Sequence, residues 1–294
     1  MAFSMQVGVL DPRLREVLMV YVLRGGALSK LSIMIASIVR EKLSSGTPIS
    51  CAKACYADPE IVEMIGQAGF DCVWICLEHR KLEPSVVRSL IQAARLGGCD
   101  SLIRVKPENH TDLAYLLESG ARGIMLPQVR DLEEVQRVVE MLRFPPIGRR
   151  GFDSIHADAD FGSGNLADYT RHENDNTFLV VQIETPEALP HIDAIAATPG
   201  VDALFVGLGD LSASMNLLGQ MDHPELQAVV ERVGTACVKH GKAGAIICSN
   251  PEERSRLWSL GYRFFNVASD FRFLRKGFDD AIASFETGRG SFPR

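Results

Sequence analysis

The chain has 294 residues, of which 46% are hydrophobic and 23% are charged, and its formal net charge at pH 7 is −6. This is the composition of an ordinary globular protein, and the length suffices for one large domain around a single core. The negative charge argues against nucleic acid as a partner, because its phosphates would be repelled. Local basic pairs such as Arg149 and Arg150 remain compatible with an anionic small molecule.

Two apolar runs lie near the start of the chain, at residues 17–23 and 31–39. Both are much shorter than the roughly 20 residues that a membrane-spanning helix needs, and Arg24 and Lys30 separate them. A basic start followed by a small-residue cleavage site is also missing, so we expect neither a membrane span nor a signal peptide. An amphipathic helix is predicted over residues 31–43.

From residue 48 onward, short apolar runs alternate with segments of helical period. Strands are predicted at residues 49–55, 72–77, 101–105, 123–127, 178–183, 203–207, 243–248 and 264–268. Helices are predicted after them, at residues 59–68, 84–96, 111–118, 132–142, 187–197, 224–240, 251–260 and 271–285. Eight βα units predict an α/β fold closed into a (β/α)₈ TIM barrel. We place an N-terminal extension with a leading helix at residues 1–45 and the barrel domain at residues 46–294.

The seven cysteines are an odd number and include no CxxC pair. Most lie in apolar, strand-like runs, where a thiol behaves as a small buried hydrophobic group. We predict reduced thiols, no zinc site and a cytoplasmic location.

Two acidic residues follow neighbouring predicted strands. Glu184 comes after the apolar run VVQI, and Asp210 comes after VGLG one βα unit later. The carboxyl ends of barrel strands form the active-site face, and a buried carboxylate is costly unless it is paired or binds a metal. The pair therefore predicts a seat for Mg²⁺, Mn²⁺ or Co²⁺, with coordination positions open for a chelating oxo-acid. For Asp210 alone, the N-cap of the next helix is the alternative.

Six segments resemble the HpcH/HpaI aldolase family of metal-dependent pyruvate aldolases. They read GFDCVWICLEHR (69–80), SLIRVKPEN (101–109), LLESGARGIMLPQV (116–129), RFPPIGRRGF (143–152), VVQIETPEAL (180–189) and VDALFVGLGDLSASM (201–215). They occur in family order and span the chain from about residue 46 to about residue 277. The resemblance implies a carbon–carbon lyase that cleaves a 4-hydroxy-2-oxo acid to pyruvate and an aldehyde through a metal-bound pyruvate enolate.

The resemblance also implies roles for individual residues. Glu184 and Asp210 correspond to the metal ligands, and Arg104 to the arginine that binds the keto oxygen and stabilises the enolate. Gln182 matches a glutamine of the substrate pocket, two residues before Glu184 on the same strand face. No Schiff-base lysine is required by this scheme, so Lys53 and Lys106, the lysines nearest the predicted strands, are expected to be solvated.

The glycine-rich turn before Asp210 is expected to contact the substrate. The backbone N–H groups of Gly207, Leu208 and Gly209, at a helix start, would hold the remaining carboxylate oxygen. Glycine permits this close approach. Family members usually carry proline where Leu208 stands.

His79 is the expected catalytic base, in the segment CLEHR where the family typically reads DGEH. The family pairs this histidine with an aspartate, and the matching position is Glu118 in LLESG. A structural histidine and a solvated helix-end Glu118 are the alternatives. Cys76 replaces another family aspartate and is expected to be a core residue.

The connection over residues 144–176 has no clear core strand. A loop that long in a compact barrel is usually functional. The resemblance implies that it shapes the substrate pocket, and a surface excursion that packs on a neighbouring subunit is the alternative. In this connection Asp158 follows His156 where related aldolases often carry a nearby arginine.

Other functions remain open. An oxaloacetate decarboxylase would use the same enolate, a CoA-ester lyase would share the barrel and the metal acids, and a catalytically idle barrel would explain the departures at Cys76, Glu118 and Asp158. The expected partner is a small-molecule oxo-acid. Residues 264–285 carry more aromatic side chains than one helix face needs, and the resemblance implies a homo-oligomer, a hexamer.

Overall fold

The computed structural model describes residues 34–288, so most of the predicted extension lies outside the described residues. Residues 34–45 belong to the same compact unit as the barrel. The leading helix α2 (Ile38–Ser45) begins seven residues later than predicted, because Ser37 caps it by accepting a hydrogen bond from the Arg40 N–H at 3.0 Å. None of the helices within the described residues has the length and apolar character that crossing a bilayer requires.

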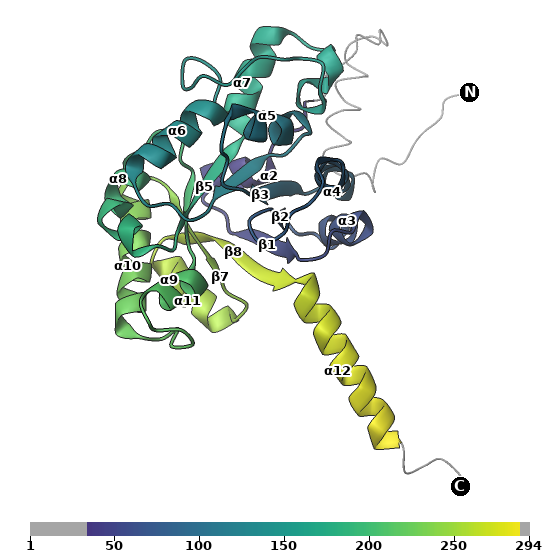
Figure 1. Cartoon of the computed structure of the whole chain (residues 1–294), viewed down its shortest axis with the longest axis vertical. Coiled ribbons are helices and arrows are strands. Elements are labelled where there is room, and N and C mark those ends of the chain that lie inside the picture. Colours follow the sequence, from purple (N-terminus) through teal and green to yellow (C-terminus); the bar gives the residue numbers. More distant parts are fainter. Residues whose placement is uncertain (1–33, 289–294) are drawn as a thin grey trace, which may run out of the picture. The chain divides into compact units, whose positions relative to one another are not determined.

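Eight parallel strands close into a barrel in chain order. Figure 1 shows strands at the centre with helices around them. They are β1 (Ile49–Ala54), β2 (Cys72–Cys76), β3 (Asp100–Arg104), β4 (Gly123–Leu126), β5 (Phe178–Ile183), β6 (Ala203–Val206), β7 (Ala243–Ile247) and β8 (Tyr262–Ser269). The predicted (β/α)₈ fold is confirmed. Each strand is nearly continuous in apolar residues because both of its faces are covered.

Helices return the chain from the carboxyl end of one strand to the amino end of the next, except the last helix, which follows the last strand. The predicted ones are α3 (Pro59–Gln67), α4 (Pro84–Gly97), α5 (His110–Glu118), α6 (Leu132–Leu142), η3 (Pro186–His191) with α8 (Ile192–Ala197), α10 (Pro224–Lys239), α11 (Pro251–Ser259) and α12 (Asp270–Gly288). Capping residues such as Asp58, Asn109, Asp131 and Asn250 set several of their starts. The short helix α9 (Leu208–Ser214) confirms the helix start expected at Gly207–Gly209, for which no bounds were predicted.

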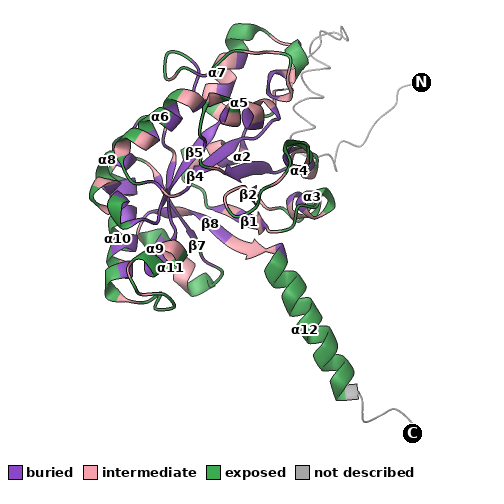
Figure 2. Cartoon of the chain, in the orientation of Figure 1, coloured by how far each residue is buried: buried purple, intermediate pink, exposed green. Residues whose placement is uncertain are grey.

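The barrel has two apolar layers. Alternate strand residues such as Cys51, Leu102 and Phe205 fill the interior, while residues between them pack against the surrounding helices. Figure 2 shows the strands buried and the outer helix faces exposed. Inward positions near the carboxyl ends therefore define the mouth where polar groups meet.

The last strand, β8, carries two irregularities. Gly244 and Ala245 of β7 pair with Tyr262 and Phe264, which leaves Arg263 as an extra residue. On the other edge, the pairing with β1 skips Val267. Such bulges redirect side chains at barrel rims. Tyr262 accordingly packs in the outer layer, and Phe264, two residues later, in the interior.

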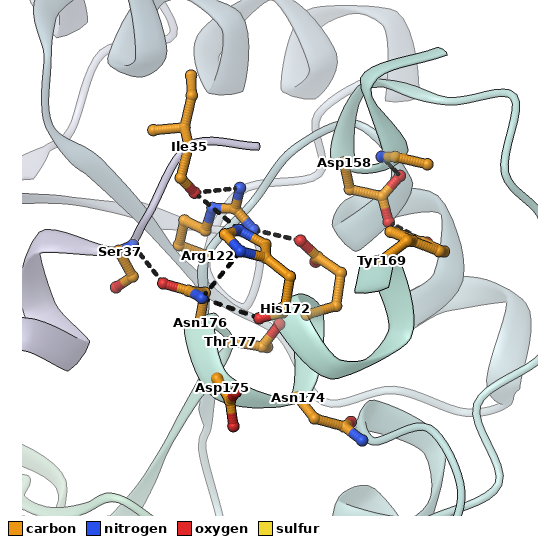
Figure 3. A network of polar contacts seen from close by, with 12 residues as sticks. Ile35, Ser37, Arg122, Asp158, Tyr169, His172, Asn174, Asp175, Asn176 and Thr177 are labelled. Atoms are coloured by element: carbon orange, nitrogen blue, oxygen red, sulfur yellow. Dashed lines mark hydrogen bonds and ion pairs between the residues drawn. The ribbon is translucent and has the colours of Figure 1, made fainter. Parts of the chain in front are cut away.

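The long connection between α6 and β5 contains η2 (Ala157–Gly162) and α7 (Leu166–Asn176) and joins the amino-terminal side of the barrel. A network of buried charges holds it there, part of which is drawn in Figure 3. Glu173 is fully buried and pairs with Arg122 at 2.6 Å, and Asp158 pairs with Arg150 at 2.6 Å and accepts from the Tyr169 hydroxyl at 2.7 Å. Asp158 is thus a structural residue in this chain.

The helix α12 presents an apolar surface. Every residue from 271 to 287 is exposed, and Figure 2 shows the helix exposed along its length. Phe271, Phe273, Phe278 and Ile282 are each more than half exposed. Several large apolar side chains exposed on one helix usually mark an interaction site.

Candidate active site

Glu184 stands at the carboxyl end of β5 and is fully buried. One carboxylate oxygen accepts the Gln128 backbone N–H at 2.8 Å, and the other accepts the Gln182 side-chain amide. Within the described residues these neutral donors are its only hydrogen-bond partners. Burial raises the pKa of Glu184 to about 7; the Gln128 N–H opposes this, and the nearby Asp210 carboxylate adds to it.

The backbone around Glu184 is shaped for it. Gln128, after β4, has a φ of 52°, a conformation that residues other than glycine rarely adopt. That conformation aims its N–H at the carboxylate, and strain of this kind clusters at ligand-binding sites. Gly207 faces the other side: a Cβ there would lie 2.5 Å from the Glu184 Oε2 atom and 2.7 Å from its Cβ. Only glycine leaves room for the acid.

Asp210 lies in the first turn of α9 and is half-buried. Its charge acts on the Glu184 carboxylate, so the structure brings the two predicted metal ligands together. The Gly207 N–H donates to the Ile183 carbonyl at 3.0 Å, so it is not available to a substrate and that part of the prediction is wrong. Leu208 and Gly209 occupy the helix start, where backbone N–H groups lack intrahelical acceptors.

Arg104 ends β3 and is buried, with 3% of its side chain exposed. Its Nε atom lies 3.0 Å from the Glu78 carboxylate, and Nη2 donates to the Cys76 sulfur at 3.0 Å. Its guanidinium carbon is 4.9 Å from the centre of the Trp74 ring. Three side chains from β2 and the turn after it therefore fix the guanidinium at the mouth.

His79 follows in the same turn. Its side chain is 56% exposed, and Nε2 lies 3.9 Å from the Glu78 carboxylate. Its backbone N–H points at the Cys76 sulfur, at 3.5 Å. Glu78 thus contacts both Arg104 and His79. No role was predicted for Glu78 from the sequence, although it stands in the segment CLEHR.

The residues at the mouth suit a divalent cation. Among residues 34–288, the buried Glu184 carboxylate has no cationic hydrogen-bond partner, and the buried Gln182 Oε1 atom has no hydrogen-bond partner. No group of three or more His, Cys, Asp or Glu side chains within residues 34–288 is arranged to hold a metal. A pair of carboxylates matches Mg²⁺, which keeps several waters and binds through one or two carboxylates plus substrate oxygens.

Comparisons with known proteins show the family of this chain. A family model described as HpcH/HpaI aldolase/citrate lyase matches residues 55–276. The 2-dehydro-3,6-dideoxy-6-sulfogluconate aldolase of Pseudomonas putida is 31% identical, over 84% of this chain and 94% of that protein. The 5-keto-4-deoxy-D-glucarate aldolase of Enterobacter sp. (strain 638) is 32% identical, over 81% of this chain and 92% of that protein.

A solved structure is similar too. An HpcH/HpaI aldolase from Desulfitobacterium hafniense DCB-2 has a TM-score of 0.80 and 26% identity, and the match covers 85% of this chain and 97% of that one. The chain belongs to the HpcH/HpaI aldolase/citrate lyase family. The family and these relatives show that it is an aldolase, a carbon–carbon lyase.

For this HpcH/HpaI aldolase the predicted pairing of His79 with Glu118 needs correction. Glu118 is the last residue of α5, which starts after the carboxyl end of β3 and ends before the amino end of β4. It therefore lies on the side of the barrel opposite His79. There it pairs with His156 at 3.6 Å and borders a hollow of about 120 Å³. Burial raises the pKa of Glu118, and the His156 ring opposes this.

Lys53, expected to be solvated, also contacts an aromatic ring. Lys53 is half-buried, two residues after the inward Cys51 on β1, and its Nζ atom lies 4.5 Å from the centre of the Trp74 ring. The alternation of side chains along β1 could have predicted this position, because it places Lys53 on the interior face.

Proposed function

We propose that this aldolase cleaves a 4-hydroxy-2-oxo acid to pyruvate and an aldehyde, with Mg²⁺, Mn²⁺ or Co²⁺ held by Glu184 and Asp210. The observation that carries the proposal is the buried Glu184 carboxylate, which lies beside Asp210 and accepts only from neutral donors within the described residues. When bound, such an ion supplies Lewis acidity that polarises the keto group of an oxo-acid.

Arg104 would hold the keto oxygen and stabilise the negative charge that develops on it. Its guanidinium is held by Glu78 and Cys76 before a substrate arrives, so little reorganisation is needed. A preorganised donor of this kind typically contributes about 2.7–4 kcal/mol to catalysis. The buried, unpartnered Gln182 Oε1 would accept a hydrogen bond from water or substrate.

His79 would carry the proton that leaves the 4-hydroxyl group during cleavage. The exposed imidazole can exchange protons with solvent, and Glu78 is the carboxylate beside it. The Leu208 and Gly209 N–H groups at the start of α9 would hold the substrate carboxylate. Glu118 has no part in this scheme because it lies on the opposite side of the barrel.

The names of two related aldolases support an inference about the class of substrate. Those named as sulfogluconate and glucarate aldolases support an acidic substrate related to sugars. A cytoplasmic location is part of the proposal, because all seven cysteines are free, as in a reducing compartment.

Exchange of pyruvate methyl protons in D₂O tests the proposal without knowledge of the aldehyde. The chelated protein should lose exchange, and Mg²⁺, Mn²⁺ or Co²⁺ should restore it. Glu184→Gln should lower metal-supported exchange at least about 1,000-fold, since several kcal/mol of charge stabilisation depend on the ion. The control is Glu187→Gln, an exposed acid three residues on, which should behave like wild type. Full exchange after thorough chelation would refute the metal mechanism.

We also propose that the protein is a homo-oligomer, a hexamer, in which α12 packs against another copy. The four aromatic and aliphatic side chains exposed on α12 support this. Burying them would stabilise the assembly by about 1.5–3 kcal/mol each before entropic losses. Light scattering at micromolar concentration should give the mass of several chains, and Phe273→Asp with Phe278→Asp should shift it toward one. A monodisperse single chain in the wild type would contradict this.

A further inference from the structure

A lysine shares the mouth with the aldolase residues. Lys53 pairs in register with Trp74 of β2 and with Ser269 of β8, near the end of β1. Ile49 and Cys51, earlier on the same face of β1, lie in the barrel interior. The two-residue alternation therefore aims the Lys53 side chain into the barrel, toward its carboxyl-terminal mouth.

The Lys53 ammonium has no acidic partner within the described residues. Asp270, at the adjacent end of β8, directs its two oxygens to the backbone N–H groups of Cys55, Tyr56 and Phe271, at 2.6–2.9 Å. The contact that the ammonium does make is with the Trp74 ring. An aromatic face can carry a cation at a partly buried position without neutralising its charge.

The Trp74 ring connects Lys53 to the catalytic arginine. The Lys53 Nζ and the Arg104 guanidinium carbon lie 4.5 Å and 4.9 Å from the same ring centre. The Trp74 indole N–H is itself buried without a hydrogen-bond partner. The wall formed by β1, β2 and β3 thus carries two cations, of which Arg104 contacts Glu78 and Lys53 contacts no carboxylate within residues 34–288.

The opposite wall has the opposite sign. In the closed order of strands, β5 and β6 lie across the barrel from β1 and β2, and they carry Glu184 and Asp210 at their ends. Lys53 and Arg104 lie against the same Trp74 ring, so a ligand whose keto oxygen meets Arg104 would extend along this ring toward Lys53. An acidic group at that end would complete the charge balance.

We propose that Lys53, with Trp74, forms a subsite for a second anionic group of the substrate, so that the aldehyde released carries a carboxylate or a sulfonate. The inference rests on the proposed function, since that function places the oxo-acid group at Glu184 and Asp210. Lys53 is then a specificity-determining residue that selects acidic over neutral substrates.

Binding of inert oxo-acids tests the subsite apart from catalysis. With Mg²⁺ present, calorimetry compares 2-oxoglutarate with 2-oxovalerate, and 2-oxoadipate with 2-oxohexanoate. Within each pair the chain length is the same and only the terminal carboxylate differs. The wild type should bind the diacid of at least one pair about 10- to 100-fold more tightly, as loss of a buried charge partner typically changes affinity by that much or more. Lys53→Met should abolish the preference, and Lys53→Arg should keep part of it.

Lys106→Met is the matched control, because Lys106 also follows a strand but contacts Gln128 and Glu134 instead of Trp74. It should keep the preference for the diacid. Lys53→Gln replaces Lys53→Met if the latter does not fold by circular dichroism. Equal affinity of the wild type for both members of each pair, or a preference that survives in the Lys53 variants, would overturn the subsite. A Lys53-dependent preference without metal-dependent exchange of pyruvate protons would overturn the proposed function and leave the subsite standing.

Discussion

The two ends of the barrel both bury carboxylates, but these carboxylates differ in their hydrogen-bond partners. On the amino-terminal side, the fully buried Glu173 meets Arg122 at 2.6 Å and lies 3.7 Å from Arg150. At the carboxyl-terminal mouth, Glu184 is equally buried and accepts only from the neutral donors Gln128 and Gln182 within the described residues. One acid is neutralised by the chain itself, and the other is not.

This difference separates structural charges from functional ones. A buried carboxylate with an arginine fixes a connection, as Glu173 does for α7. A buried carboxylate without one keeps the protein less stable than it could be, and a perturbed pKa of that kind is typical of functional sites. Burial raises the pKa of Glu184 to about 7. For Arg122, burial lowers the pKa, but Glu173, together with Asp100 and Asp158, more than offsets this, so the pKa is raised.

Changing each glutamate to glutamine gives the strongest test of this contrast. Glu173→Gln should lower the free energy of unfolding by about 3–5 kcal/mol, because it leaves Arg122 buried without a counter-charge. Glu184→Gln should leave it unchanged or raise it, because Gln182 can turn its unpartnered Oε1 toward the new amide. Urea unfolding of the metal-free protein measures both. Equal losses in the two variants would mean that Glu184 is a structural residue after all.

A smaller effect is expected at Asp100, an acid on the amino-terminal side that lacks a direct arginine partner. It accepts from the Ser37 hydroxyl at 2.6 Å and the Val39 N–H at 2.9 Å, and burial raises its pKa from 3.8 to about 6 against these two donors. The folded state therefore holds this proton at higher pH than the unfolded state does. The contribution of Asp100 to stability is fully present below pH 3.8 and is lost as the pH rises to about 6.

Asp100→Asn should remove this dependence. The difference in unfolding free energy between variant and wild type should change in favour of the variant by up to about 3 kcal/mol between pH 4 and pH 8, at about 1.4 kcal/mol per pKa unit. Denaturant titrations at both pH values measure it, and the charges common to both proteins cancel. A difference that does not vary with pH would show that Asp100 is ionised in the folded protein throughout.

The fold could be predicted from the sequence because its signals are local. Apolar runs bounded by helix caps define each βα unit, so strand β5 and helix α6 match their predicted residues. Helix α7 could not be predicted in the same way, because few of its residues are apolar and charges such as Glu173 hold it in place. An ion pair between distant segments leaves no periodic pattern in the sequence.

The candidate site was predictable where a residue ends a strand. Glu184, directly after β5, and Arg104, at the end of β3, lie at one face because parallel strands bring their carboxyl ends there, and Asp210 follows in the first turn of α9. A motif match does not say at which end of the barrel a residue lies, so it could not place Glu118. Glu118 ends a helix that runs from the carboxyl end of β3 back to the amino end of β4, which puts it on the side opposite His79. Glycine is needed at position 207 because a Cβ atom there would lie 2.5 Å from the Oε2 atom of Glu184, 23 positions earlier. No sequence pattern encodes this contact.

The irregular pairing of β8 has a consequence for how such a barrel can change in evolution. Inserting one residue in a strand reverses every later side chain, so a mouth built on alternation tolerates substitutions far better than insertions. At Arg263 and Val267 this barrel already contains two extra residues, each skipped in the pairing with one neighbouring strand. Strand β8 is thus the strand of this barrel in which an extra residue is accommodated without turning Phe264 away from the interior, and where we expect a one-residue insertion to be tolerated best.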